Sequence, residues 1–236
     1  MSGALQDLVG EIEHQITNDL MLASATVAAL AGVVADTTEP TPSLIEVNAQ
    51  RLKDGAFESD AELLNAIALH GPVAGDLRLI TALMHITHHQ GLIANQFVLI
   101  TAQLMETDPR VPVIEETAGK LVRMATLAGA QLTKATRALC DRSLALAREV
   151  ADDDAAINLL NRQVFATTVR TDGTELERDV MMRQMLIGRS IERIADNAVD
   201  IAEHAAFLVT GEVTEFSDAS RPRVLQAADA SATPRA

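Results

Sequence analysis

Residues 187–204, IGRSIERIADNAVDIAEH, carry the pattern that decides the fold. They lie inside a long stretch in which apolar residues recur with the spacing of an amphipathic α-helix. One face of this helix stacks charged or titratable side chains four residues apart: Glu192, Asp196, Asp200 and His204. Like charges at this spacing cost a few tenths of a kcal/mol per pair. Either a ligand binds this face, or water and nearby arginines make it tolerable.

Helical spacing extends through most of the chain. It begins near the N-terminus, where apolar residues recur at Leu5, Leu8, Ile12 and Ile16. It is interrupted where Pro, Gly, Thr and Asp gather, a composition that favours turns. The pattern predicts an all-α fold of six long helices, at about residues 5–34, 43–70, 73–107, 113–142, 144–170 and 174–210.

Three helix ends carry recognisable signals. Ser43 with Glu46, and Thr174 with Glu177, have the spacing of a capping box, in which each side chain bonds to the other residue's backbone N–H. Gly211 follows the last periodic residue and is expected to end the sixth helix as a C-cap.

The third and sixth predicted helices correspond in length and punctuation. When they are superimposed, Asp76 faces Glu177 and Asn95 faces Asp196. We interpret this as an internal duplication of a three-helix unit. Because long helices need antiparallel neighbours, two tandem three-helix bundles are the economical arrangement. The expected domains are residues 1–107 and 111–212, followed by a flexible tail at 213–236.

Composition limits the classes of partner. The chain has 236 residues, is 48% hydrophobic and contains five Phe with no Tyr or Trp, as suits closely packed helices. Its net charge of -14 argues against nucleic-acid binding, which needs a basic surface, and against adhesion to anionic lipid. Cations or basic protein patches are the natural partners.

Cysteine usage and the first residues indicate a compartment. A single cysteine, Cys140, excludes an intramolecular disulfide and favours a reducing cytoplasm. Cys140 has no convincing base partner, so we expect it to be a buried small hydrophobic residue. The acidic start, MSGALQDLVGEIEHQ, does not resemble a signal peptide, and no run of about 18 uninterrupted apolar residues occurs.

The acidic face of residues 187–204 has two interpretations. Glu192, Asp196 and Asp200 lie about 6 Å apart along one ridge, and such oxygen ligands suit Mg²⁺, Mn²⁺ or iron. Alternatively, the ridge is a solvated face on which Arg189 and Arg193 provide the counter-charges. Spacing alone favours the solvated face.

Two further segments bear on a metal site. Asp154, in ADDDAAIN, could approach the Glu192–Asp196 face if the fifth and sixth helices are adjacent. At the corresponding place in the third helix every carboxylate is replaced. The residues Glu192, Arg193, Asp196 and Asp200 correspond there to Gly91, Leu92, Asn95 and Leu99. The carboxylates are therefore not required by the fold.

Three histidines lie near that place, His85, His88 and His89. His85 and His89 share a helix face and could chelate Zn²⁺, but no matching His or Cys cluster occurs elsewhere. We interpret them as surface or interface histidines, which could give pH sensitivity if they titrate near neutrality.

Catalytic motifs are absent from the sequence. It contains no Gly-rich phosphate loop, GxSxG, HExxH or paired CxxC, so we name no catalytic or cofactor-binding residues. A ferritin-like di-iron site needs Glu-x-x-His on two helices, and only Glu11–His14 supplies one. We expect a non-enzymatic protein, with a metal-dependent enzyme or metal-storage bundle as the alternative.

Three phrases resemble the PhoU family of phosphate-transport regulatory proteins: GPVAGDLRLITALM, ALAREVADDDAAINLL and SIERIADNAVDIAEHAAFLVTGE. The resemblance implies a cytoplasmic negative regulator of the phosphate-starvation response, peripheral to the membrane through its partners. Those partners would be the ATPase subunit of the phosphate ABC transporter and a sensor histidine kinase. A homodimer is also expected.

The resemblance also implies a metal site. The family's motif falls on Glu192, Asp196 and Asp200, with Asp154 on the partner helix, and Ala195 replaces the usual Gly. Gly91, Leu92 and Asn95 cannot reproduce the motif in the first repeat. We therefore expect at most one site, in the second repeat, for Mg, Mn, Fe or Zn.

Overall fold

The computed structural model describes residues 3–34, 42–107, 114–170 and 172–216. Within these ranges the chain forms six α-helices and no strand, which confirms the predicted all-α fold. The helices are α1 (Gly3–Val34), α2 (Pro42–His70), α3 (Gly75–Glu106), α4 (Glu115–Cys140), α5 (Leu144–Arg170) and α6 (Glu175–Thr210).

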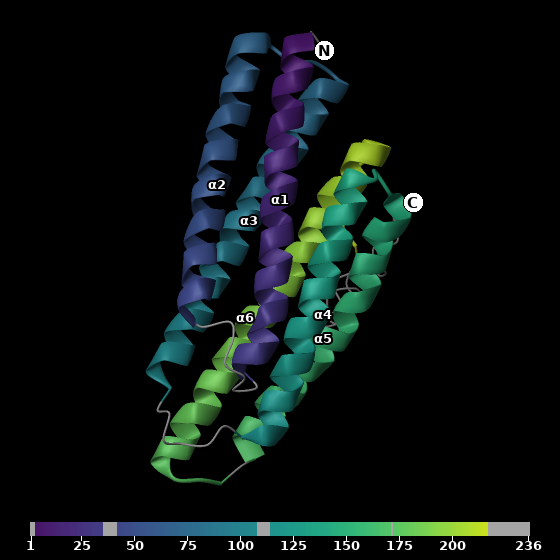
Figure 1. Cartoon of the computed structure of the whole chain (residues 1–236). Helices are drawn as coiled ribbons and strands as arrows, with labels where there is room; N and C mark the ends of the chain where they lie inside the picture. Colours follow the sequence, from purple (N-terminus) through teal and green to yellow (C-terminus); the bar gives the residue numbers. More distant parts are fainter. Residues whose placement is uncertain (1–2, 35–41, 108–113, 171, 217–236) are drawn as a thin grey trace, which may run out of the picture.

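The helices form two three-helix bundles that lie side by side along their length (Figure 1). Helices α1, α2 and α3 make the first bundle, and α4, α5 and α6 make the second. The bundles are joined where α1 packs against α4 and α3 packs against α6. One hydrophobic core runs through both bundles, so the expected boundary between domains 1–107 and 111–212 stays a prediction.

Burial repeats from one bundle to the other. In α2 and α5, Leu52 corresponds to Val150 and Ala56 to Asp154, and all four are buried. The same holds for the longer run of buried positions shared by α3 and α6: Ile86 and Ile187, Gln90 and Ile191, Ile93 and Ile194, Ala94 and Ala195, Phe97 and Ala198, Ile100 and Ile201. The core pattern thus supports an internal duplication of three helices.

The α1–α4 seam depends on small residues. A Cβ on Gly129 of α4 would lie 2.9 Å from Ala28 Cβ and 3.1 Å from the Ser24 carbonyl oxygen of α1. Ser24 Oγ donates a 2.8 Å hydrogen bond to the Gly129 carbonyl oxygen, and the Ser24 and Thr133 hydroxyls lie 2.5 Å apart. The missing side chain at Gly129 therefore lets the two helices approach closely enough for these bonds.

The predicted helix ends are confirmed at α6 and wrong at α2. Thr174 and Glu177 form the expected capping box, and Gly211 has the left-handed conformation of a C-cap, with φ 73°. Ser43, however, lies inside α2, which includes Pro42. Proline suits the first helical turn because the backbone N–H that it lacks would have no partner there.

Two other expectations, on Cys140 and on the predicted tail, can be compared with the structure. Cys140 is exposed at the end of α4, with Sγ 3.8 Å from Thr17 Oγ1, so the expected burial is wrong. In the predicted tail, the Phe216 backbone N–H donates a 2.5 Å bond to Glu203 Oε1. The rest of that tail, residues 217–236, lies outside the described residues.

Within the described ranges, α1 alone is long and apolar enough to cross a membrane by length and composition. In this structure its apolar stripe, which includes Ile12, Ile16 and Leu20, is buried in the protein core. A core helix passes the same test of composition, so α1 is accounted for by its packing.

Candidate functional site

Two buried carboxylates meet between α5 and α6. Asp154 and Glu192 are each only 5% exposed. Arg189, one turn before Glu192, forms an ion pair with it, and the Asn161 side chain hydrogen-bonds to it. Burial raises the pKa of Glu192, and the charge of Asp154 acts in the same direction while Arg189 opposes it. The prediction that Asp154 approaches Glu192 is confirmed.

The surroundings of Asp154 add an amide oxygen to this pair. Asn158 Nδ2 donates a 2.5 Å hydrogen bond to Asp154 Oδ2. Asn158 Oδ1 is buried and has no hydrogen-bond partner among the described residues. Two carboxylates and an amide oxygen are the ligand types of a hard divalent cation, so these residues fit Mg²⁺ or Mn²⁺.

The other two predicted ligands lie further along α6. Asp200 is 47% exposed and faces α3, where its Oδ2 is 3.4 Å from His89 Nδ1. Eight residues separate Glu192 from Asp200, about 12 Å along the helix, so one ion cannot touch both. Asp196 is partly buried between them. Among the described residues, no group of three or more His, Cys, Asp or Glu side chains is arranged to hold a metal, and the metal site stays a prediction.

The histidines form a cluster at the α3–α6 seam. The ring centroids of His85 and His204 are 4.7 Å apart and nearly parallel, and those of His89 and His204 are 5.5 Å apart. His89 Nδ1 lies 2.9 Å from Asn197 Oδ1. Burial lowers the pKa of His89, and it lowers that of His204 to about 4, where the neighbouring His89 and His85 add to the shift. At neutral pH His89 and His204 are therefore neutral interface groups.

The first bundle has a pocket where the second has the carboxylate pair. Gly91 corresponds to Glu192 and Ala56 to Asp154, and a Cβ on Gly91 would lie 4.0 Å from Ala56 Cβ. The pocket has a volume of about 250 Å³, and its lining includes Gly91, Leu92 and Asn95. The replacement of carboxylates that the sequence indicated therefore leaves a pocket between α2 and α3.

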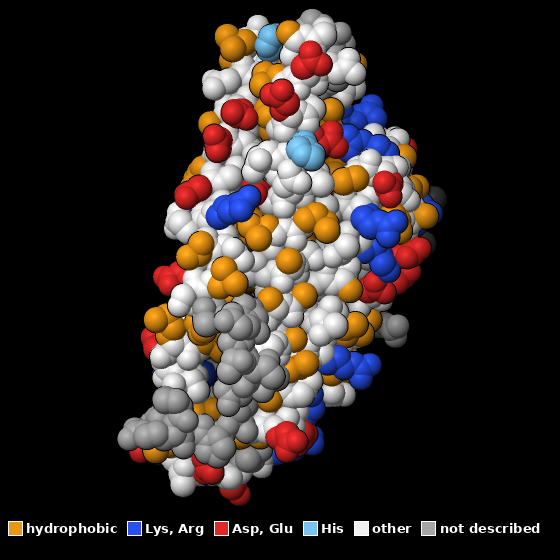
Figure 2. Space-filling model, in the orientation of Figure 1, with side chains coloured by type: hydrophobic (Ala, Val, Ile, Leu, Met, Phe, Trp, Pro, Cys, Tyr) orange, Lys and Arg blue, Asp and Glu red, His pale blue; other side chains and the backbone are white. Residues whose placement is uncertain are grey.

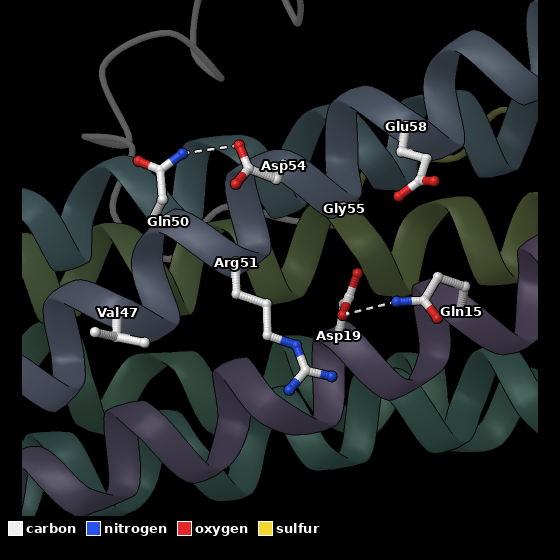
Figure 3. Close-up of a pocket in the computed structure, with 8 residues that line it drawn as sticks. All are labelled: Gln15, Asp19, Val47, Gln50, Arg51, Asp54, Gly55 and Glu58. Atoms are coloured by element: carbon white, nitrogen blue, oxygen red, sulfur yellow. Dashed lines mark hydrogen bonds between the residues drawn. The ribbon is translucent and has the colours of Figure 1, made fainter.

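A third buried carboxylate, in the first bundle, was missed from the sequence. Asp19 on α1 is fully buried at a cleft of about 490 Å³ between α1 and α2 (Figure 3). Gln15 Nε2 and Gln90 Nε2 donate to its two oxygens at 3.2 and 3.1 Å. Its signal in the sequence was a charged residue on the apolar stripe, between Ile16 and Leu20.

The fold and this site define a class: all-α proteins of two three-helix bundles with a carboxylate pair between the last two helices. Residues 121–205, which cover most of α4 to α6, match the family model described as the PhoU domain. The phosphate-specific transport system accessory protein PhoU homolog 1 of Methanothermobacter thermautotrophicus is 28% identical over 170 residues, 70% of this chain and 75% of that protein. The homolog 1 of Mycobacterium tuberculosis is 27% identical over 213 residues, 85% of this chain and 94% of that protein. The chain is thus similar to PhoU proteins over most of its length, and its residues 121–205 match the PhoU domain.

Solved structures agree with the fold. The PhoU of Streptococcus pneumoniae superimposes with a TM-score of 0.75 at 18% identity, over 90% of this chain and 100% of that one. The PhoU of Pseudomonas aeruginosa gives a TM-score of 0.68 at 19% identity, over 88% and 99%. Both are helical bundles of the same architecture.

Proposed function

We propose that this chain is an accessory protein of a phosphate-specific transport system and acts by binding rather than by catalysis. The observation that carries the proposal is the match to curated relatives of that name, one of which aligns over 85% of this chain. The match to the PhoU domain covers the helices that hold the buried carboxylate pair.

In its specific form, the proposal is a negative regulator of phosphate uptake and of the phosphate-starvation response. The protein would be cytoplasmic, reach the membrane through its partners, and join the transporter ATPase subunit to a sensor histidine kinase. The six helices are long (Figure 1) and each carries exposed residues, so their outer faces would offer docking surfaces that support such a role. Phe57 on α2 and Phe165 on α5 are 68% and 56% exposed, so both bundles present large apolar side chains to a partner.

A divalent ion at the carboxylate pair would tune this binding. Asp154, Glu192 and the Asn158 amide oxygen would hold it, with Asp196 one turn further along α6. The ion would supply positive charge to a buried pair of like charges, and so stabilise the α5–α6 contact. Oxygen donors favour Mg²⁺ or Mn²⁺, and carboxylates also suit iron.

Capture from phosphate-replete cells tests the adaptor role. A tagged chain is expected to retain the transporter ATPase and a histidine kinase, and deletion is expected to raise phosphate-responsive gene expression in rich phosphate. The tag alone serves as the control. Absence of both partners together with unchanged expression would contradict the proposal. Stoichiometric iron oxidation by the purified protein would instead favour a metal-storage bundle.

The homodimer is a separate expectation. Sedimentation of the purified chain measures it directly, and a single species with the mass of one chain across a wide range of concentration would contradict it.

A further inference from the structure

The cleft between α1 and α2 has a negatively charged floor. Asp19 is fully buried there, and Asp54 and Glu58 line the α2 side (Figure 3). Arg51 and Gln15 approach Asp19 from opposite sides. The cleft is open to solvent, with a volume of about 490 Å³.

The absence of a side chain at Gly55 leaves room for the Asp19 carboxylate. A Cβ on Gly55 would lie 2.3 Å from Asp19 Oδ2, far inside contact distance. The chain therefore has a glycine in the middle of α2 at the point where Asp19 enters. A glycine in a helix interior is less favourable than an alanine, so the buried acid is accommodated at the expense of helix stability.

Among the described residues, no cation forms a hydrogen bond with Asp19. Its hydrogen bonds come from the neutral amides of Gln15 and Gln90, and it forms no ion pair with any described residue. Arg51 acts on it electrostatically without bonding to it. Burying a carboxylate without a cation is costly, so a positive group that enters the cleft would gain a strong interaction.

Gln90 places an unsatisfied acceptor next to Asp19. Its Nε2 lies 3.1 Å from Asp19 Oδ2 and would be 3.5 Å from a Cβ on Gly55. Its Oε1 is buried and has no hydrogen-bond partner among the described residues. Buried amide oxygens are usually paired, so an unpartnered one next to Asp19 adds a partial negative charge at this place.

We propose that this cleft binds an arginine side chain presented by a partner protein, with Asp19 as the principal anion and Glu58 at the rim. A guanidinium carries several N–H donors and can bond to a carboxylate through two of them. A metal ion fits less well, because no described group of three or more His, Cys, Asp or Glu side chains is arranged to hold one.

Charge complementarity points to a protein as the source of the arginine. The net charge is -14, and acidic side chains are spread over the face that Figure 2 shows. A basic segment is therefore attracted to the surface before it reaches the cleft. Arg51 repels the incoming cation and so limits its affinity. This inference rests on the proposed adaptor role only for the existence of a protein partner.

Binding of N-acetyl-arginine amide to the purified full chain tests the inference without any partner. Titration followed by ¹H–¹⁵N NMR is expected to shift the amide signals of Gln15, Arg51 and Gly55 saturably. The neutral isostere N-acetyl-citrulline amide is expected to bind at least about tenfold more weakly. Equal binding of the two probes, or shifts confined to other regions, would overturn the inference. The inference would also be overturned if K⁺ or Mg²⁺ alone produced the same shifts of the amide signals and the arginine probe did not displace the ion.

Variants separate the cleft from general acidity. Asp19→Asn is expected to weaken the arginine probe about tenfold, whereas Glu11→Gln, an exposed acid on the same helix, leaves affinity within about twofold. Arg51→Gln is expected to tighten binding. If Asp19→Asn does not fold, Glu58→Gln decides the matter, with a loss of about threefold expected. If the folded variants bind the arginine probe as tightly as the wild type, the cleft is rejected as the arginine site, even if partners are captured from cells. If the variants weaken binding of the probe but no partner is captured from cells, only the adaptor role is rejected.

Discussion

Glu192 on α6 faces Asp154 on α5, and both carboxylates are buried. Arg189 offsets their mutual repulsion on one side, and beside them Asn158 Oδ1 has no hydrogen-bond partner in the part of the chain that the structure describes. Two like charges in a dry interface are costly unless a proton or a cation joins them.

Replacing the pair is expected to lower bound metal. In Asp154→Asn combined with Glu192→Gln, divalent metal content measured by elemental analysis falls by at least half, because the two anionic ligands are lost. Glu192→Gln with Asp196→Asn is expected to act in the same direction. Asp152→Asn, an exposed acid on α5, is the control and keeps the wild-type content. A wild-type protein that carries no metal would contradict the proposal.

A second metal equivalent can be built into the first bundle. Gly91→Glu together with Ala56→Asp places a carboxylate pair where the duplication already positions the backbone. If the second bundle binds one ion, the double variant is expected to bind two, measured by equilibrium dialysis with Mn²⁺. Gly91→Gln with Ala56→Asn is the neutral control. An unchanged stoichiometry in a folded variant would show that helix correspondence alone does not make the site.

His204 makes the seam sensitive to acid. Its folded pKa of about 4 lies below the ordinary value of 6.5, so folding favours the neutral ring. Its contribution to stability is complete above about pH 6.5 and is lost as the pH falls towards 4. The unfolding free energy of the wild type, measured with urea, is expected to decrease between pH 7 and 4.5. In His204→Phe this decrease is expected to be smaller by roughly 1 to 3 kcal/mol. His70→Gln, an exposed control, leaves the profile unchanged, and an identical profile for His204→Phe would refute the assignment.

Gly129 controls the approach of the two bundles. Gly129→Ala is expected to cost roughly 1 to 3 kcal/mol of unfolding free energy, because its Cβ meets Ala28 Cβ at 2.9 Å. Gly119→Ala, also in α4, meets no atom within 4 Å and is expected to stabilise by roughly 0.5 to 1 kcal/mol. Equal effects of the two substitutions in thermal melts would rule out steric control at the seam.

Local signals in the sequence were sufficient for the helices and for two of their ends. The period of apolar residues, the Thr174–Glu177 capping box and Gly211 each depend on neighbours within one or two turns. The approach of Asp154 to Glu192 could also be predicted from the sequence, because adjacent antiparallel helices leave few alternative pairings of their side chains. Ser43 was misread because Pro42 is itself compatible with the first helical turn.

The rest depends on contacts between distant segments. Asp19 is explained by Gln90, which is 71 residues away, and by the space over Gly55. The pattern of α6 alone could not reveal that His204 meets His85, because only the α3–α6 packing brings their rings together. Cys140 is exposed because it lies in the last turn of α4, where the helix face that holds the core ends.

The seams between the bundles have a thermodynamic consequence. Since α1 packs on α4 and α3 on α6 through one uninterrupted apolar interior, neither half can melt without exposing the other's core. The duplicated halves are therefore expected to unfold in a single cooperative step. A ligand that binds to either half is then expected to raise the melting temperature of the whole chain. Binding in one bundle would therefore also stabilise the other bundle, without any conformational change.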